Sequence, residues 1–399
     1  MNVLFITLYG FESIKERNIY PDLIREFIKN GHHVYTISPV EKREGVETHI
    51  NKEGNSTILR LQIGNTQKTN IIEKGINTVL LEPRYTKAIK KYFSDVKFDL
   101  VLYSTPPITL VAPVAYVKKR DGARAYLLLK DIFPQNAVDI GMMTTTGLKG
   151  LLYKIFRKKE KKLYALSDKI GCMSEANVQY ILKHNPEIDS KKVEVCPNSL
   201  EIIDKSVSEQ ERVKIRNKYN IPLDKKVFVY GGNLGKPQGI PFIVKCLKKC
   251  EDISDAYFLI VGNGTEYHLL EEYVNNNPQN VKLMKTLPRE DYDTLVGACD
   301  VGLIFLDHRF TIPNFPSRLL AYMQAKLPVL ACTDSNTDIG KAIVDGGFGW
   351  WCESDDVNTF FDRIGEAIGC EKETLGNNAF KYLKKYYDIF DAVKKIIIE

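Results

Sequence analysis

One segment of the chain is more informative than any other. It reads Asn314-Phe315-Pro316-Ser317-Arg318-Leu319-Leu320-Ala321-Tyr322-Met323 and is followed shortly by Pro328-Val329-Leu330-Ala331. Pro316 fixes the backbone, Ser317 is a residue type that caps helices with its hydroxyl, and the next apolar residues recur at helical spacing. A helix start offers unpaired N–H groups and a partial positive charge, to which Arg318 adds a cation suited to phosphate. The segment therefore predicts a loop, a diphosphate-binding helix start and a strand, with a capped core helix as the alternative.

A glycine-rich loop favours the first interpretation. Residues Gly231-Gly232-Asn233-Leu234-Gly235-Lys236 follow an apolar strand and precede a helix near Ile240. Glycines allow a backbone to approach a phosphate or a sugar, and the start of the next helix faces that position. A tight turn that needs positive φ is the alternative. The run Gly262-Asn263-Gly264 lacks the third glycine of a dinucleotide fingerprint, so we interpret it as a turn.

Length and composition indicate a globular protein with more than one domain. Of 399 residues, 44% are hydrophobic and 27% are charged. No apolar run is long enough to cross a bilayer, and the chain opens on a strand-like run instead of a signal peptide. The eight Cys lie between Cys172 and Cys370 without a Cys-x-x-Cys pair, which is typical of reduced thiols. We therefore expect a cytoplasmic protein.

Short apolar runs alternate with helical stretches in both halves of the chain. The strands predicted in the first half are 3–7, 34–38, 100–103, 125–129 and 169–173, with helices such as 20–29 and 87–93 between them. Those in the second half are 227–230, 258–261, 281–284, 301–305 and 329–331. This alternation predicts an α/β fold of two doubly wound, Rossmann-like domains with parallel sheets covered on both faces. Ligands bind beyond the carboxyl ends of such strands, and tandem domains predict a cleft between them.

Motifs in both halves resemble those of one enzyme family. They are 130–134 (Lys-Asp-Ile-Phe-Pro), 197–199 (Pro-Asn-Ser), 227–235, 259–264 (Leu-Ile-Val-Gly-Asn-Gly), 298–304 and 316–328. Their order and spacing resemble family-four glycosyltransferases of the GT-B class, in particular bacterial capsule and O-antigen polysaccharide transferases. The resemblance implies a sugar nucleotide in the second domain, an acceptor on the first, retaining transfer and a C-terminal helix that returns to the first domain. We accordingly expect domains at 1–200 and 201–378 and a crossing helix at 379–399.

The donor side has a set of candidate residues in the second half. They are Gly232, Asn233, Leu234, Gly235, Lys236, Thr286, Leu287, Asn314, Phe315, Pro316, Ser317, Arg318 and Leu319. Thr286 and Leu287 end a strand at which backbone groups of the resembled family meet the nucleobase, and a plain strand end is the alternative. Many members of that family carry two Glu at the positions of Pro313 and Ala321, and an Arg and a Lys at those of Asn233 and Gln238. Arg318 and Lys236 are therefore the cations expected to stabilise the departing diphosphate.

The acceptor side has two candidates in the first half. Asp131 follows the apolar strand 125–129, a position from which a carboxylate can bind a hydroxyl or take its proton. A helix N-cap or a turn residue is the alternative. Asn198 is either a turn residue or a ligand contact. Asp291 and Asp293 fall in a predicted helix, where residues two apart point away from each other, so no metal site is predicted.

The segment from Lys149 to Lys162 concentrates positive charge. It holds seven Lys or Arg and one Glu, a local charge of +6 that equals the formal net charge of the whole chain, so the rest is balanced and no nucleic-acid partner is expected. Apolar residues recur between the cations, which predicts a basic amphipathic helix for an anionic membrane, with an ordinary solvated helix as the alternative. The residues expected to contact the membrane are Lys154, Arg157, Lys158, Lys159, Lys161 and Lys162.

These expectations describe a nucleotide-sugar-dependent glycosyltransferase of the hexosyltransferase type. It would move a sugar from a nucleotide diphosphate sugar, with UDP expected and no further cofactor or metal, to a hydroxyl of a polyprenyl-linked saccharide in cell-surface polysaccharide synthesis. Arg318 and Asp131 are the expected catalytic residues, and the inner face of the plasma membrane is the expected location of a peripheral enzyme. Two alternatives stay open: a catalytically silent GT-B scaffold subunit, which the missing Glu pair favours, and a GT-B sugar-nucleotide epimerase, against which the basic helix argues.

Overall fold

The computed structural model describes residues 1–66, 71–276 and 278–398, and the chain divides into two units. Unit 1 comprises Met1–Glu201 with Ile389–Glu399, and unit 2 comprises Ile202–Asp388. The single crossing helix expected at 379–399 is instead two helices, of which α14 (Lys372–Tyr386) belongs to unit 2 and α15 (Ile389–Ile398) to unit 1. The two are separate because α14 packs on α11 (Arg318–Gln324) of unit 2 while α15 packs on α1 (Ile19–Lys29) of unit 1. Glu399 lies outside the described residues.

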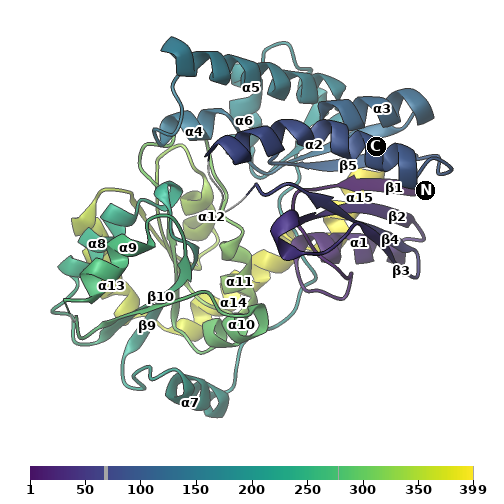
Figure 1. Cartoon of the computed structure of the whole chain (residues 1–399). Helices are drawn as coiled ribbons and strands as arrows, with labels where there is room; N and C mark the ends of the chain where they lie inside the picture. Colours follow the sequence, from purple (N-terminus) through teal and green to yellow (C-terminus); the bar gives the residue numbers. More distant parts are fainter. Residues whose placement is uncertain (67–70, 277, 399) are drawn as a thin grey trace. The chain divides into compact units, whose positions relative to one another are not determined.

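Unit 1 is built on an eight-stranded sheet in the order β3-β4-β2-β1-β5-β6-β7-β8 (Figure 1). Its strands are β1 (Asn2–Ile6), β2 (His33–Glu41), β3 (His49–Glu53), β4 (Ser56–Ile63), β5 (Leu100–Thr105), β6 (Arg124–Leu129), β7 (Lys169–Cys172) and β8 (Val193–Val195). All neighbours pair in parallel except β3 with β4. The apolar runs predicted five of these strands, whereas β3 and β4 were missed because polar residues interrupt them and β8 because it is short.

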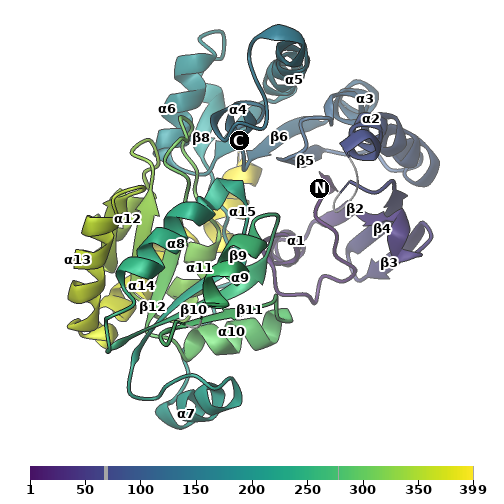
Figure 2. The same ribbon diagram turned by 60° about the vertical axis from the view of Figure 1, so that its left-hand side comes forward.

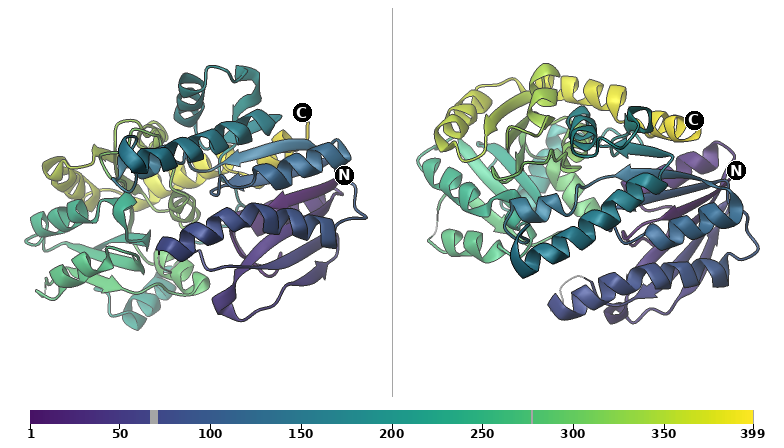
Figure 3. Two further views of the ribbon diagram at one scale, coloured as in Figure 1. Left: turned by 45° about the horizontal axis from the view of Figure 1, so that its top comes forward. Right: turned by 90° about the horizontal axis from the view of Figure 1, so that it is seen from above.

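Two helical layers cover the sheet of unit 1. Its helices are α1 (Ile19–Lys29), α2 (Ile71–Tyr92), α3 (Val111–Asp121), α4 (Gln135–Asp139), α5 (Gly147–Leu166), α6 (Glu175–His184) and α15. Right-handed crossovers place α2, α3, α5 and α6 on one face, while α1 and α15 pack together on the other (Figure 1). Figure 3 shows the first layer from two other sides. Phe5, Phe27 and Val393 belong to the apolar core beneath α1 and α15.

Unit 2 has a six-stranded parallel sheet in the order β11-β10-β9-β12-β13-β14 (Figure 2). The strands are β9 (Lys226–Asn233), β10 (Ala256–Asn263), β11 (Val281–Met284), β12 (Val301–Phe305), β13 (Val329–Thr333) and β14 (Gly349–Glu353). The helices are α7 (Glu209–Lys218), α8 (Ile240–Lys249), α9 (Tyr267–Val274), α10 (Arg289–Gly297), α11 (Arg318–Gln324), α12 (Ile339–Asp345), α13 (Val357–Ile368) and α14. The prediction of two doubly wound α/β domains is confirmed, since both sheets carry helices on both faces.

Parallel strands bring the residues after their carboxyl ends to one edge of each sheet. In unit 1 this edge holds Lys130 and Asp131 after β6 and Cys196 after β8. In unit 2 it holds the glycine loop after β9 and Asp334 after β13. The candidate residues of each unit are therefore gathered by topology although they lie far apart in the sequence. Within the described ranges, no helix has the length and apolar character needed to cross a membrane.

Candidate functional site

The glycine loop of unit 2 is held by a pair of amides. Strand β9 continues to Asn233, so Gly231 and Gly232 end the strand instead of forming a loop. Asn233 Nδ2 donates to Gln238 Oε1 at 2.8 Å, and the Gly235 N–H donates to the same oxygen at 3.4 Å. The two positions at which the resembled family carries cations therefore bond to each other and bring no charge to this edge of the sheet.

Two positions require glycine, the first because another group occupies the space of a side chain and the second because of its backbone conformation. A Cβ on Gly231 would lie 1.7 Å from the Tyr292 hydroxyl oxygen. Gly232 has a φ of +133°, and its Cβ would lie 3.4 Å from Arg318 Nη2. The backbone of Gly232 thus lies directly beside the guanidinium group, although 86 residues separate the two positions in the chain. This juxtaposition joins the glycine loop and the segment around Arg318 in one site.

Arg318 carries the positive charge of this site. Its guanidinium carbon lies 4.4 Å from the centre of the Tyr230 ring, a cation–π contact that fixes the side chain. Burial opposes the charge, but Tyr230 and Tyr322 hold the pKa of the guanidinium above its ordinary value. Arg318 Nη1 and Asn314 Nδ2 are both buried and lack a hydrogen-bond partner among the described residues. Each orphaned donor costs about 1–3 kcal/mol, and the oxygens of a bound phosphate or sugar would satisfy both.

The helix start after Ser317 differs from its prediction. Ser317 occupies the N-cap position of α11, but its side chain makes no capping hydrogen bond, so that prediction is wrong. The reason is local: Ser317 has helical dihedrals (φ −63°, ψ −14°) instead of the extended ones of a capping residue. The N–H groups of Leu319 and Leu320 already donate to the Pro316 and Ser317 carbonyls, at 3.2 and 3.1 Å. The capacity of this segment to bind an anion therefore rests mainly on the Arg318 side chain.

The remaining donor candidates lie around the same edge in different environments. The Lys236 side chain is exposed and makes no ion pair with any described residue, whereas Leu234 is buried in the core. Thr286 is exposed and Leu287 half-buried, just beyond the end of β11. The Phe315 ring packs on Tyr387 of the same unit at 6.0 Å between centroids. Leu319 is fully buried, so its side chain belongs to the core and not to a ligand contact.

Three tyrosines complete the site, and none was among the candidates from the sequence: Tyr230, Tyr292 and Tyr322. The Tyr322 hydroxyl lies 3.1 Å from the Val229 and Leu303 carbonyl oxygens and accepts the Gly231 N–H at 3.3 Å. It also hydrogen-bonds the Tyr292 hydroxyl, and burial raises the pKa of both groups. Tyr322 thereby links β9 to β12 behind the glycines. Its helical spacing of four from Arg318 was the available signal, because such residues share a helix face.

Asp334 is a further site residue that no sequence pattern singled out. Its carboxylate accepts the N–H groups of Asn336 and Thr337, each at 2.9 Å, and the Thr337 hydroxyl at 3.0 Å. The Thr337 oxygen in turn accepts the Asn314 N–H at 3.0 Å. Burial raises the pKa of Asp334 to about 6, although these hydrogen bonds lower it. Asp334 therefore holds the turn that positions Asn314.

Asp131 in unit 1 has the environment of a reactive carboxylate. Burial raises its pKa to about 6, against the lowering effect of hydrogen bonds from the Ile132 N–H and Asn136. Asn136 Nδ2 lies 2.8 Å from each carboxylate oxygen. The alternative that Asp131 caps the next helix is wrong, because the N-cap of α4 is Pro134. The half-buried carboxylate is thus oriented by a side chain from the first turn of α4.

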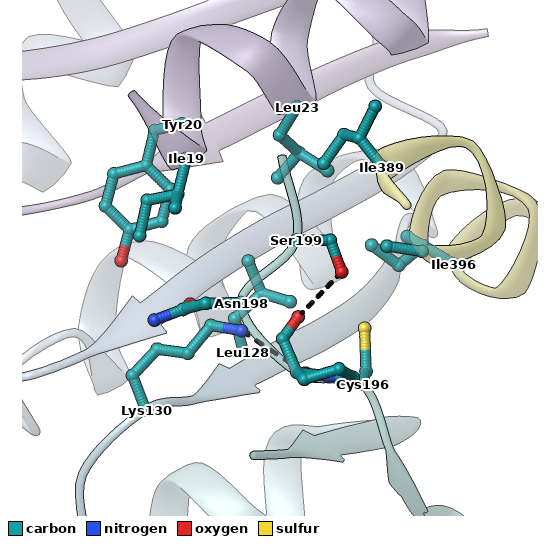
Figure 4. Close-up of a pocket in the computed structure, with 12 residues that line it drawn as sticks. Ile19, Tyr20, Leu23, Leu128, Lys130, Cys196, Asn198, Ser199, Ile389 and Ile396 are labelled. Carbon is teal, nitrogen blue, oxygen red and sulfur yellow. Dashed lines mark hydrogen bonds between the residues drawn. The ribbon is translucent and has the colours of Figure 1, made fainter. Parts of the chain in front are cut away.

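Asn198 lies beside an unexpected cation, Lys130. Both line a narrow crevice with Tyr20 of α1 and with Ile389 and Ile396 of α15 (Figure 4). Lys130 Nζ donates to the Cys196 carbonyl at 3.3 Å, and burial lowers its pKa to about 8. In the sequence, Lys130 is part of the motif 130–134, and no role was predicted for its side chain. Its position directly after a buried strand, next to Asp131, was the available signal.

The basic segment forms α5, so the predicted helix is confirmed, but its cations differ in accessibility. Arg157 bonds to Glu160 Oε2 at 2.7 Å, the His184 carbonyl at 3.0 Å and Asn185 Oδ1 at 2.6 Å. Lys159 pairs with Glu82 at 2.6 Å, and Lys161 pairs with Glu187 at 2.9 Å. Three exposed lysines make no ion pair with any described residue: Lys154, Lys158 and Lys162. The side chain of Lys149 is outside the described part of the chain.

An open groove follows the basic side of α5. It is lined by Tyr153, Lys154, Arg157, Lys158, Lys161, Lys162, Ala165 and Glu187. Asp291 and Asp293, by contrast, are held in ion pairs with Lys218 and Lys205 on the α10 side of unit 2. The groove of α5 is therefore lined by five cations and one carboxylate.

Comparison with known proteins indicates the class of enzyme. Residues 211–382 match the family described as glycosyl transferases group 1. The probable glycosyltransferase WbjE of Pseudomonas aeruginosa is 24% identical over 304 residues, which cover 74% of this chain and 73% of WbjE. This protein is a glycosyltransferase, and its group 1 match is confined to residues 211–382. The matched domain and the glycosyltransferase relatives support a transferase that depends on a nucleotide sugar, which agrees with the buried cation at the edge of unit 2.

Two further proteins extend the comparison. The putative colanic acid biosynthesis glycosyl transferase WcaI of Escherichia coli K12 is 22% identical over 249 residues, which cover 61% of this chain and 60% of WcaI. The crystal structure of Anabaena HepE in complex with UDP and glucose superposes with a TM-score of 0.69, at 13% identity, over 99% of this chain and 98% of HepE. The fold of this transferase is accordingly GT-B, as the motifs predicted.

Proposed function

We propose that the protein transfers a hexosyl group from UDP-sugar to a hydroxyl of a polyprenyl-linked saccharide, with retention of configuration, in the synthesis of a cell-surface polysaccharide such as a capsule or O-antigen. The observation that carries the donor half is the pair of orphaned buried donors, Arg318 Nη1 and Asn314 Nδ2, on one segment that also touches Gly232. A nucleotide diphosphate supplies the oxygens that both groups lack. UDP is favoured because HepE was solved with UDP.

The leaving group sets the main energetic demand of this reaction. As the bond to the sugar breaks, the nucleotide diphosphate gains negative charge, and a fixed cation lowers the energy of that state more than the energy of the bound donor. Arg318 meets this demand because Tyr230 holds its guanidinium in place before the ligand arrives. The exposed Lys236 is the second cation that we assign to the diphosphate.

The acceptor half of the proposal rests on Asp131 and its neighbours. With a pKa near 6, this carboxylate is ionised at neutral pH, so it can accept a hydrogen bond from the attacking hydroxyl. Asn198 and Lys130 line the crevice near the same sheet edge and are assigned to the acceptor's polar groups. WbjE and WcaI, the latter named for colanic acid biosynthesis, support a polysaccharide product.

The surface of α5 supports the lipid part of the acceptor assignment. Lys154, Lys158 and Lys162 are exposed without ion pairs to described residues, beside a groove open to solvent. Each such cation contributes about 1 kcal/mol near an anionic membrane surface. We therefore place the working enzyme on the inner face of the plasma membrane, where polyprenyl-linked saccharides are met.

Two measurements test the proposed function. Thermal melting in the presence of UDP, GDP, CMP and their sugar conjugates should show a raised melting temperature with UDP compounds, since a ligand that binds only the folded state stabilises it. The best donor is then incubated with a polyprenyl-linked saccharide and with the free saccharide, and transfer is followed by mass spectrometry. Stabilisation by another nucleotide alone would replace UDP, and equal transfer to both acceptors would remove the lipid requirement.

A further inference from the structure

Exposed apolar side chains gather on two helices of unit 1. On α2 they are Ile76, Val79 and Leu80, with exposed fractions between 38% and 67%. On α5 they are Leu151, Leu152 and Ile155, with exposed fractions between 47% and 60%. We call these six residues the apolar surface. Soluble proteins rarely leave such a set uncovered, and an exposed contiguous patch marks an interaction site.

Topology places both helical stretches at the same end of unit 1. Helix α2 connects β4 to β5 and α5 connects β6 to β7, and all four strands run in parallel. Each helix must therefore run opposite to the strands, with its N-terminal half at their carboxyl edge. Both helices also lie in the layer on one face of the sheet (Figures 1 and 3). The apolar surface thus lies at the edge that holds Asp131.

A shared carboxylate ties the two helices together at the base of this surface. Glu82 of α2 pairs with Lys159 of α5 at 2.6 Å, and its other oxygen accepts the N–H of Val111, the first residue of α3, at 3.1 Å. Val79 precedes Glu82 by one turn, and Ile155 precedes Lys159 by one turn. Val79 and Ile155 therefore project from the faces on which the Glu82–Lys159 ion pair joins α2 and α5.

Cations of α5 border its apolar side chains, since Leu151 precedes Lys154 and Lys158 by three and seven residues. Leu152 and Ile155 share a side with Lys159, since they precede it by seven and four residues. Lys154, Lys158 and Lys161 are spaced by four and three and line the groove instead. The same end of unit 1 thus presents an apolar surface flanked by a basic one. That combination matches the acyl boundary and the anionic headgroups of a bilayer.

A second copy of the chain fits this surface less well. A two-fold contact joins the same patch on both copies, so it would bring two sets of unpaired lysines to one interface, where they repel. We propose that the apolar surface inserts into the acyl boundary of an anionic membrane, with α2 as a second inserting helix beside α5. This inference rests on the membrane association in the proposed function and assigns its inserting residues.

Helix α5 also connects the apolar surface to the acceptor segment. The Phe156 ring contacts the Phe133 ring with centroids 5.1 Å apart, and the Tyr153 hydroxyl donates to Gln135 Oε1 at 3.2 Å. Both contacts reach the residues that directly follow Asp131. Insertion of α2 and α5 would therefore hold Asp131 near the membrane plane, where a lipid-linked acceptor carries its hydroxyl.

A substitution on α2 tests the inference without touching α5 or the proposed catalytic residues. The variant Ile76→Ser/Val79→Ser/Leu80→Ser should bind phosphatidylglycerol-containing vesicles at least about tenfold more weakly than the unmodified protein, at both low and high salt. The control Val46→Ser/Ile50→Ser changes two exposed apolar residues of unit 1, one just before the edge strand β3 and one within it, and should bind like the unmodified protein. Sedimentation with vesicles measures the bound fraction of both variants and of the unmodified protein.

A second measurement keeps the test independent of the folding of the triple variant. Fluorescence of Val79→Trp should be quenched by vesicles with brominated acyl chains, and fluorescence of Ile50→Trp should not. Undiminished vesicle binding by the triple variant, or no quenching at position 79, overturns the inference, and so does a change in self-association alone. If the unmodified protein binds no anionic vesicle, membrane association itself fails, while transfer to a soluble saccharide still decides the proposed activity separately.

Discussion

Replacing Arg318 with Ala should remove catalysis while leaving the fold nearly as stable as before. The substitution loses the cation–π contact with Tyr230, worth about 0.5–2 kcal/mol. It also removes the buried Nη1 that has no hydrogen-bond partner among the described residues, a group that costs about 1–3 kcal/mol. These contributions have opposite signs and similar size. The free energy of unfolding without ligand should therefore change by less than about 1 kcal/mol.

The same substitution should have a large effect once a nucleotide is present. A hydrogen bond to a charged group contributes about 1.5–3 kcal/mol, and a loss of about 2 kcal/mol raises the Kd for UDP about 30-fold. At a UDP concentration of about 100 times the Kd of the unmodified protein, binding stabilises that protein by about 2.7 kcal/mol and the variant by about 0.9 kcal/mol. The loss in the transition state should reach about 2–4 kcal/mol, which lowers kcat/KM about 30- to 1,000-fold.

Thermal melting with and without UDP, followed by a transfer assay, measures all of these quantities. Arg318→Lys is the matched comparison, because it keeps the charge but not the planar group that stacks on Tyr230, and it should give intermediate values. A folded Arg318→Ala protein with an unchanged UDP shift and unchanged turnover would refute the assignment. Early unfolding of the ligand-free variant would show instead that Arg318 is structural.

Three further predictions concern other parts of the chain. Asp131→Asn should lower transfer but keep UDP affinity in calorimetry; because folding raises this pKa from 3.8 to about 6, urea unfolding should show the unmodified protein losing stability as the pH rises from about 4 to 6, and the variant should lose less over this range, where Asp334 also contributes. Gly231→Ala should destabilise by about 1–3 kcal/mol because its Cβ meets the Tyr292 hydroxyl, whereas Gly365→Ala, with nothing within 4 Å, should not. Lys154→Gln/Lys158→Gln/Lys162→Gln should weaken vesicle binding at low salt only, with melting temperature and UDP affinity unchanged.

Each of these predictions has an outcome that contradicts it. Loss of UDP affinity in Asp131→Asn would move this residue out of the acceptor site. Equal stability of the two glycine variants would mean that Tyr292 can move aside. For the lysines, Arg157→Gln is the contrasting variant: it should melt earlier because it loses bonds to Glu160, His184 and Asn185. Vesicle binding that survives in the lysine variant at low salt would make these cations an ordinary solvated face.

Local patterns in the sequence were sufficient for the architecture. Apolar runs such as 125–129 and 301–305 became buried strands, since a parallel sheet buries both faces and needs no alternation of polar residues. Helix 20–29 was placed to within one residue at its start, because its apolar spacing reports the face that packs on the sheet. Most of α2 was missed for the converse reason: Ile76, Val79 and Leu80 are exposed, so they do not follow the pattern of a packed helix.

The sequence also singled out Arg318, Gly232 and Asp131, because residue type and position after a strand are local properties. What these residues touch was decided only by the tertiary structure. Contacts such as Arg318 with Tyr230 join positions far apart in the chain, and a single sequence carries no record of which positions meet. The same holds for charge: Arg157 and Lys159 look like their neighbours in the sequence, yet folding gives both of them partners and leaves Lys154, Lys158 and Lys162 to the surface.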